Sequence, residues 1–311
     1  MKKVLVTLSI FALSHNAIAL EKMNDQDLAS QTGQDGLTIK LGVSAVSFKQ
    51  LALIDTNGMA GATNSAALIV APTTSTDIVK VNFANSSGAP LVNLVTATID
   101  ADGGAAAGAT FANINLAFSE LKTIEVQPFA IYVAPTLSST GAMGGTGSIF
   151  NGTALRSGVS KLLEIGNNTE KLTLNFKDSL GVNIQPGNPQ QGHLIKLSGS
   201  LQSINIPKVK LFSKNTTSAV DSSIGFDAQL TATNAAGISM VGFYGDIVNS
   251  GLVLGKDGTT DKFNLTLSNV VAGTTGSQSA TSFNNLKNAS IGTIGLVGAS
   301  VTNLKMTVKG L

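Results

Sequence analysis

Histidine is the scarcest residue that could do acid–base or metal chemistry in this chain. The sequence has 2 histidines and no cysteine. His15 lies in the apolar start of the chain, so a Ser-His-acid triad would have to use His193, which stands in a polar loop entering a strand. No Gly-x-Ser-x-Gly motif follows a strand, and a zinc site of His and Cys cannot be built. We therefore expect a structural His193 and no catalytic residue.

Two other kinds of site lack the residues that usually build them. The chain has no tryptophan and only 2 tyrosines, so no platform for a sugar ring is evident. Glycine-rich strings at 58–66 and 144–152 lack the Lys-Ser/Thr ending of a phosphate-binding loop. We expect no cofactor and no enzymatic activity.

Aspartates in glycine-containing turns could hold a metal ion. Asp55, Asp100 and Asp102 lie in such turns, as do Asp257 and Asp261, and hard oxygen ligands suit Ca²⁺. Asp and Gly are also what ordinary β-turns use. No loop shows the twelve-residue calcium hand with its terminal Glu, and none shows the glycine-rich nonapeptide series. The pattern favours turn formation over a calcium site at Asp55, Asp100 and Asp102.

The elements that must position these residues are strands. Apolar side chains alternate with Ser, Thr, Asn, Lys or Asp from end to end, which is typical of half-buried strands. The clearest runs are Leu37–Leu41, Ile114–Phe118, Leu172–Phe176, Ile204–Leu211, Ile224–Leu230, Phe263–Leu267 and Leu304–Val308.

Turn signals separate these runs. They lie at 55–58, 100–104, 166–169, 185–189 and 256–258. Lys161–Phe176 is the clearest predicted antiparallel hairpin, because a four-residue polar centre joins two apolar runs; a helix over Val159–Ile165 is the alternative. The low-complexity stretches 103–110 and 138–148 are predicted as loops.

Composition supports an extended fold. Charged residues make up 12%, and Gly, Ala, Ser, Thr and Asn are abundant, which favours β structure with many turns. We predict an all-β fold: an elongated antiparallel β-sandwich or curled sheet with a short N-terminal helix. A β-solenoid-like C-terminal portion is the alternative, since apolar residues of 285–310 are spaced among Gly, Asn and Ser.

The first residues have the order of a secretory signal peptide. Lys2 and Lys3 precede the apolar run Val4–Leu13, and Ala17-Ile18-Ala19 supplies the small residues of a cleavage site. We expect export through an inner membrane, with domains at 1–19 (signal peptide), 20–42 (helix, turn and strand) and 43–311 (elongated β domain). Without the two leader lysines the chain holds 18 basic and 18 acidic residues, so no nucleic-acid partner is expected.

The segment after the leader predicts a short helix that turns into a strand. Asn24 can cap the helix, Asp25 lies in its first turn, and Leu28 can contact Met23 across the cap. Gly33 is placed as a left-handed C-cap, Gln34 as a turn residue, and Gly36 as the entry to the strand.

This segment resembles the mature start of the FilA-type pilus-system proteins, and the similarity continues through Val46–Gly58. The resemblance implies an exported protein of a Gram-negative bacterium, associated with a filament or pilus system and without known enzymatic activity. The matching residues are Leu20, Met23, Asp25, Leu28, Thr32, Gly33, Gln34, Gly36, Leu37, Thr38 and Ile39.

From the residues and the resemblance together, we expect a non-enzymatic structural or adhesive component at the periplasm, outer membrane or cell surface. Its expected partners are other pilus-system or envelope proteins, with self-association through strand edges, for which the terminal strand Val301–Val308 is one candidate. The alternative is a periplasmic carrier that holds a hydrophobic ligand in a β groove.

Overall fold

The described part of the chain is built from strands. The computed structural model describes residues 36–58, 61, 64–91, 93–103, 108–135, 148–213, 222–273 and 290–309. The chain divides into two compact units, Met1–Leu37 and Thr38–Leu311, and all strands described below lie in the second except for the first residue of β1. In the described residues no helix is long and apolar enough to cross a membrane. The predicted all-β fold is confirmed, while the predicted short N-terminal helix lies outside the described residues.

Strand lengths differ widely along the chain, and the two longest strands, β13 and β14, lie in its middle. In chain order the strands are β1 (Leu37–Leu41), β2 (Ala45–Phe48), β3 (Leu51–Asp55), β4 (Ala66–Ala71), β5 (Val79–Ala84), β6 (Val95–Asp102), β7 (Phe111–Phe118), β8 (Thr123–Val126), β9 (Phe129–Pro135), β10 (Phe150–Asn151), β11 (Ala154–Leu155), β12 (Ser160–Ile165), β13 (Leu172–Ile184), β14 (Ile195–Ser213), β15 (Ser222–Ala232), β16 (Ile238–Ser239), β17 (Phe243–Val248), β18 (Gly251–Lys256), β19 (Phe263–Ala272), β20 (Gly292–Ala299) and β21 (Lys305–Val308).

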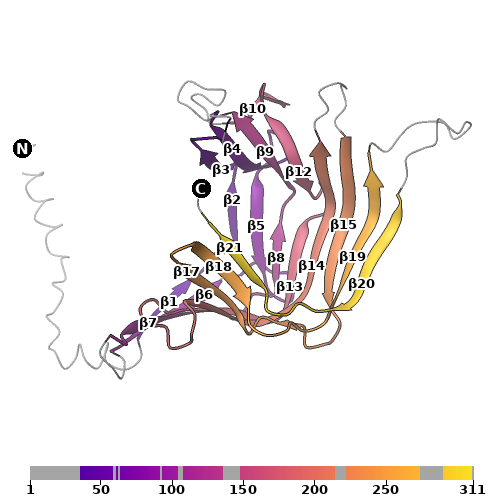
Figure 1. Cartoon of the computed structure of the whole chain (residues 1–311). Helices are drawn as coiled ribbons and strands as arrows, with labels where there is room; N and C mark the ends of the chain where they lie inside the picture. Colours follow the sequence, from indigo (N-terminus) through magenta and orange to yellow (C-terminus); the bar gives the residue numbers. More distant parts are fainter. Residues whose placement is uncertain are drawn as a thin grey trace, which may run out of the picture. The chain divides into compact units, whose positions relative to one another are not determined.

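One series of antiparallel pairings, the first branch, leads from β2 and β3 to β20 (Figure 1). β2 and β3 pair with β5 and β4, which pair in turn with β8 and β9. Those two strands pair with β13 and β12, both of which pair with β14. β15, β19 and β20 then follow in order.

The two faces of the first branch differ in polarity. One row of directly opposed residues is apolar on every strand it crosses: Phe83, Ile124, Leu174, Ile204, Leu230, Leu265 and Leu296. The neighbouring row, which points to the other face, is mostly polar: Asn82, Glu125, Thr173, Asn205, Gln229, Thr266 and Gly295. Successive side chains of a strand alternate between the two faces of a sheet. The part of the first branch that these two rows cross therefore has one apolar face and one mostly polar face.

A line of irregularities crosses the first branch. The segments 72–78, between β4 and β5, and 166–171, between β12 and β13, leave the sheet opposite Gln127 and Pro128, which separate β8 from β9. On β14 and β19 the line continues as the positive φ angles of Lys208 (50°) and Asn269 (54°), next to shifts in register. Each strand direction resumes beyond the line, so these segments are insertions within long strands.

The predicted hairpin over Lys161–Phe176 is therefore wrong. β12 and β13 run in the same direction, because both are antiparallel to the stretch that contains β8 and β9. The polar centre closes on itself instead: the backbone N–H groups of Asn167 and Glu170 each donate to the other's carbonyl oxygen. Turn residues at this point produce a bulged loop and not a chain reversal. The alternative helix over Val159–Ile165 is also wrong, since β12 occupies Ser160–Ile165.

A second branch shares β13 and β14 with the first. The C-terminal half of β13 pairs with β7, which pairs with β6. The N-terminal half of β14 pairs with β16 and β17, and β18 and β21 follow β17. The strands change neighbours near Gly199 of β14, whose φ of 95° suits glycine. A Cβ there would lie 2.3 Å from the carbonyl oxygen of Ser179, so the backbones approach too closely for a side chain.

Two clusters of buried side chains form the core. In the first, small and large residues of β4 and β9 are covered by Ile149 and Val159. In the second, Leu91, Leu94, Leu121 and Phe176 are buried together. Against them pack residues of both branches, among them Phe83, Ile124 and Leu174 from the first and Phe118 and Leu180 from the second. The apolar faces of the two branches therefore meet on the inner side of the bend at β13 and β14.

The C-terminal strands belong to the same antiparallel sheet. β20 pairs with β19, and β21 pairs with β18, in both cases antiparallel. The described C-terminal residues thus give no parallel coils, and the solenoid alternative is wrong for them.

Candidate functional site

The apolar face of the first branch remains open toward solvent over much of its width. A second row of this face consists of Leu51, Val70, Ile131, Leu163, Leu211, Ile224 and Ala272. Ile224 and Leu230 lie on the same face of β15, because six residues separate them on a strand that alternates without interruption. Leu51, Leu211 and Ile224 of this row are all exposed. Exposed apolar patches of this extent mark contact surfaces.

Both ends of the first branch are open edges in the described residues. β20 pairs with β19 on one side, and its residues from Gly292 to Val297 are all exposed. It carries no charged residue and no proline, which are the usual protection of a free edge. At the other end, β3 exposes Leu51, Leu53 and Ile54, and Leu53 keeps 73% of its surface. Such edges can accept a strand from another chain.

The second branch has an apolar patch of its own. Leu252 lies opposite Ile247 on β17 and opposite Val308 on β21, and all three side chains are exposed. Leu254 and Met306 form the next exposed pair of the same face. In the described residues β21 pairs with β18 alone, so the C-terminal part of the predicted edge at Val301–Val308 is an edge of this branch.

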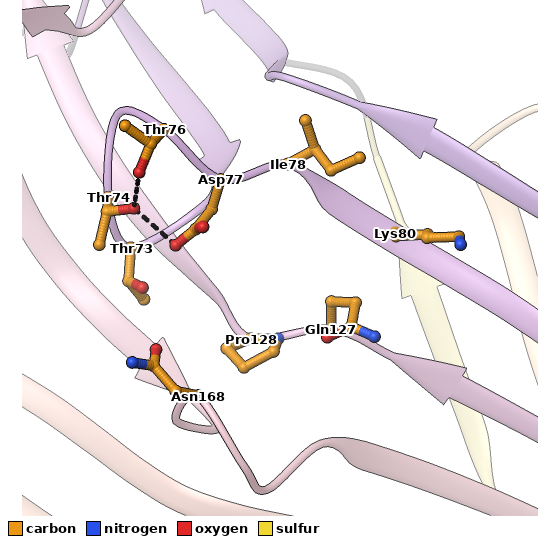
Figure 2. A pocket seen from close by; sticks show the side chains of 9 residues that line it. All are labelled: Thr73, Thr74, Thr76, Asp77, Ile78, Lys80, Gln127, Pro128 and Asn168. Carbon is orange, nitrogen blue, oxygen red and sulfur yellow. Dashed lines mark hydrogen bonds between the residues drawn. The ribbon is translucent and has the colours of Figure 1, made fainter.

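A polar cavity of about 690 Å³ lies where the irregular line crosses β8 and β9. The two bulged segments and the strand between them supply its walls, and Figure 2 shows Asp77 directed toward Thr74 while Lys80 points away from both. Thr74 Oγ1 donates to Asp77 Oδ2 at 2.5 Å, and Thr74 and Thr76 are 3.2 Å apart at their hydroxyls. The polar groups of this loop therefore bind one another, which explains its shape without a ligand.

His193 joins two carboxylates from distant parts of the sequence. Its Nδ1 lies 2.6 Å from Asp246 Oδ2, and its Nε2 lies 3.1 Å from Asp257 Oδ2. Tyr244 stacks on the imidazole ring with 3.8 Å between ring centroids. Both ring nitrogens are thus engaged, so the side chain links the start of β14 to β17 and to the end of β18. The sequence holds no signal for this cluster, since 53 and 64 residues separate the partners.

Two partly buried aspartates have pKa values below the ordinary value of 3.8. Burial raises the pKa of Asp246, but hydrogen bonds from His193 and the backbone N–H of Leu194, with the charge of His193, lower it further than burial raises it. Burial likewise raises the pKa of Asp227, and hydrogen bonds from Asn269 and Lys208, with the Lys208 charge, outweigh that effect. Both carboxylates therefore stay ionised while they hold neighbouring strands together.

Of the residues of the N-terminal motif, the structure describes Gly36 and the strand residues Leu37, Thr38 and Ile39. Gly36 has a φ of 64° and directly precedes β1, a conformation that suits glycine at the entry to the strand. The other motif residues lie outside the described residues: Leu20, Met23, Asp25, Leu28, Thr32, Gly33 and Gln34.

The structure separates the aspartates suggested for calcium: Asp55 lies in its predicted turn, whereas Asp100 and Asp102 belong to a strand, so their predicted place in a turn is wrong. Asp55 Oδ1 accepts hydrogen bonds from the N–H groups of Asn57 and Gly58, which is the turn predicted there. Asp100 and Asp102 lie on β6 of the second branch, and Asp100 Oδ1 accepts from the N–H of Ala101. Across the described ranges, no three His, Asp or Glu side chains gather in a way that could hold a metal ion. Calcium binding stays a prediction that a calcium titration can test.

Comparison with known proteins places only the N-terminal part of the chain. Residues 1–119 match the model of a family of unknown function (DUF6160). No curated protein and no solved structure matches the chain. The match covers the N-terminal motif and the strands β1 to β7, which include the open edge at β2 and β3.

Proposed function

We propose that this protein is an exported, non-enzymatic structural or adhesive component of a pilus or filament system, of the FilA type that its N-terminal motif resembles. In this proposal the protein acts by binding: its open strand edges and its uncovered apolar face bind other envelope or filament proteins. The observation that carries the proposal is that one sheet ends in two exposed, apolar edges, at β3 and at β20.

The character of the edges supports a role in assembly. Soluble monomers normally protect a free edge with Lys, Pro or a bulge, because an open edge pairs with other chains. β20 carries a bulge next to Gly298, but its eight residues include no Lys and no Pro, and it exposes Ile294, Leu296 and Val297. An edge of this kind suits added-strand pairing, in which main-chain hydrogen bonds supply affinity and alternate side chains supply specificity.

Deletion of the gene tests this function. We expect the deletion strain to lose surface filaments or surface attachment, with its envelope lipid composition unchanged, and a wild-type copy to restore them. Immunogold labelling of intact cells would place the protein at the surface or inside the envelope. Unchanged filaments and unchanged attachment would contradict the proposal.

A second candidate function is a periplasmic carrier of a hydrophobic ligand. The observation in its favour is the bend at β13 and β14, where the apolar faces of the two branches meet on the inner side. Beyond the buried cluster at the bend, apolar residues such as Leu211, Ile224 and Leu254 remain exposed on these faces. A concave apolar surface is what a lipid carrier requires.

Native mass spectrometry separates the two functions. Protein purified from its own cell envelope is expected to give concentration-dependent multimers if it is a filament component. Co-purified lipid at a fixed ratio, with a monomeric protein, would instead favour the carrier.

A further inference from the structure

The two open edges of the first branch run in opposite directions. Every pairing between β2–β3 and β20 is antiparallel, and an odd number of steps separates them. A second copy placed beside the first in the same orientation would therefore bring its β2–β3 edge antiparallel to β20. The sheet could continue from copy to copy without a change in its pattern of pairing.

We propose that copies of this chain associate head to tail, with β20 of one copy adding to the β2–β3 edge of the next. The inference rests on the proposed function, because it names a second copy as the partner of these edges. It goes further in assigning which edges meet, in which direction, and with which face shared.

The faces of the joined sheets match. Ile294 and Leu296 lie on the apolar face at the β20 edge, and Leu51 lies on that face at the β3 edge. Head-to-tail pairing therefore places apolar beside apolar across the junction. Charge does not oppose it: β20 is uncharged, and the carboxylate of Asp55 at the end of β3 is held by its own turn.

The exposed area indicates a weak but repeatable contact. Full burial of one aliphatic side chain removes roughly 60–120 Å² of apolar surface, so the seven exposed side chains of the two edges supply on the order of 400 Å². Main-chain pairing between the two edges adds to this area, and the total buried interface area stays near the low end for specific interfaces, below about 1,200 Å². These seven are Val46, Leu51, Leu53, Ile54, Ile294, Leu296 and Val297. We therefore expect association that depends on concentration.

Head-to-tail contact uses both edges, whereas a two-fold contact uses one. Pairing of β20 with β20 would leave the exposed side chains of β3 in water, and pairing of β3 with β3 would leave those of β20. A repeated head-to-tail contact leaves open edges only at the ends of the series. Such a heterologous contact closes into a ring or grows into a filament, depending on the rotation between neighbours.

The lack of cysteine makes this inference directly testable. Single variants Leu51→Cys and Leu53→Cys mark the β3 edge, and Ile294→Cys and Leu296→Cys mark the β20 edge. A disulfide forms only where Cα atoms lie within about 7 Å, so oxidation of mixed variants reports which edges meet. Gln229→Cys, exposed on the polar side of β15, is the matched control, and melting curves verify that each variant is folded.

We expect cross-linked dimers when a β3-edge variant is mixed with a β20-edge variant, in combinations that share one antiparallel register. We expect few cross-linked dimers from each variant alone and from each mixture with Gln229→Cys. Equal cross-linking of a β20 variant with itself, or no cross-link in any mixture of folded variants, would overturn the inference. If no mixture cross-links but gene deletion abolishes the filaments, the proposed function stands and its edges bind a partner other than a second copy. If no mixture cross-links and the filaments persist after deletion, both the head-to-tail inference and the proposed function are wrong.

Discussion

His193 shows how single residues hold this sheet together. Its ring connects Asp246 on β17 and Asp257, which directly follows β18. The sequence singles out His193 because histidine is rare, and Asp257 because it lies in a glycine-containing turn, but it does not bring them together. The contacts depend on long-range register, which no local pattern encodes.

Replacing Asp246 with Asn should destabilise the fold at neutral pH but have little effect in acid. The pKa of Asp246 in the folded protein is lower than the ordinary 3.8, so its carboxylate stabilises the fold above pH 3.8. That contribution is lost as the pH falls through the folded pKa. The difference in melting temperature between wild type and variant should therefore shrink below about pH 3.8.

Asp100→Asn is the control, since Asp100 is exposed and its Oδ1 accepts from the N–H of the next residue. A melting difference for Asp246→Asn that stays constant down to pH 2 would contradict this role.

At the point where β14 changes neighbours, glycine is required by its positive φ and also because there is no space for a Cβ atom. Gly199→Ala should lower the free energy of unfolding by ~1–3 kcal/mol more than Gly192→Ala does. Gly192 has a similar φ of 86°, but nothing lies within 4 Å of a Cβ there, so it isolates the strain of the backbone angle. Chemical denaturation of both variants measures the difference; equal losses would show that β13 and β14 do not approach as described.

At the scale of elements, alternation predicts strands well and connections poorly. Ile224, Phe226, Ala228 and Leu230 alternate without a break, and β15 is a strand as predicted. The stretch Lys161–Phe176 shows the same alternation on both sides of a polar centre, but the chain continues in one direction. Turn residues fit a hairpin and a bulged loop equally, so only the partner strands decide between them.

The hydroxyl of Tyr132 links β9 to the start of one bulged segment, and removal of this hydroxyl tests the link. The buried hydroxyl donates to the carbonyl oxygen of Pro72 at 3.0 Å, and burial raises the pKa of the phenol well above its usual value. Tyr132→Phe leaves the buried carbonyl without this donor, so we expect a loss of ~1–3 kcal/mol in unfolding free energy. Tyr244→Phe keeps its ring on His193 and should cost less. A Tyr132→Phe variant as stable as wild type would contradict the link.

The whole molecule combines a small buried core with a wide uncovered apolar face. The sequence indicates the alternation that produces this face, since apolar residues recur at every second position within separate runs such as Leu172–Phe176, Ile224–Leu230 and Phe263–Leu267. It does not indicate that the two branches share β13 and β14, because that depends on the neighbour change at Gly199. The open edges likewise follow from strand order, which a single sequence does not contain.

Sedimentation velocity over a wide range of protein concentration tests the central claim, that this protein works through contact at its open edges. The wild-type sedimentation coefficient should rise with concentration, and Leu296→Lys at the β20 edge should abolish the rise. Gln229→Lys, exposed and away from both edges, should behave as wild type. A wild type that sediments as a monomer at every concentration, or an unchanged rise in folded Leu296→Lys, would contradict the account.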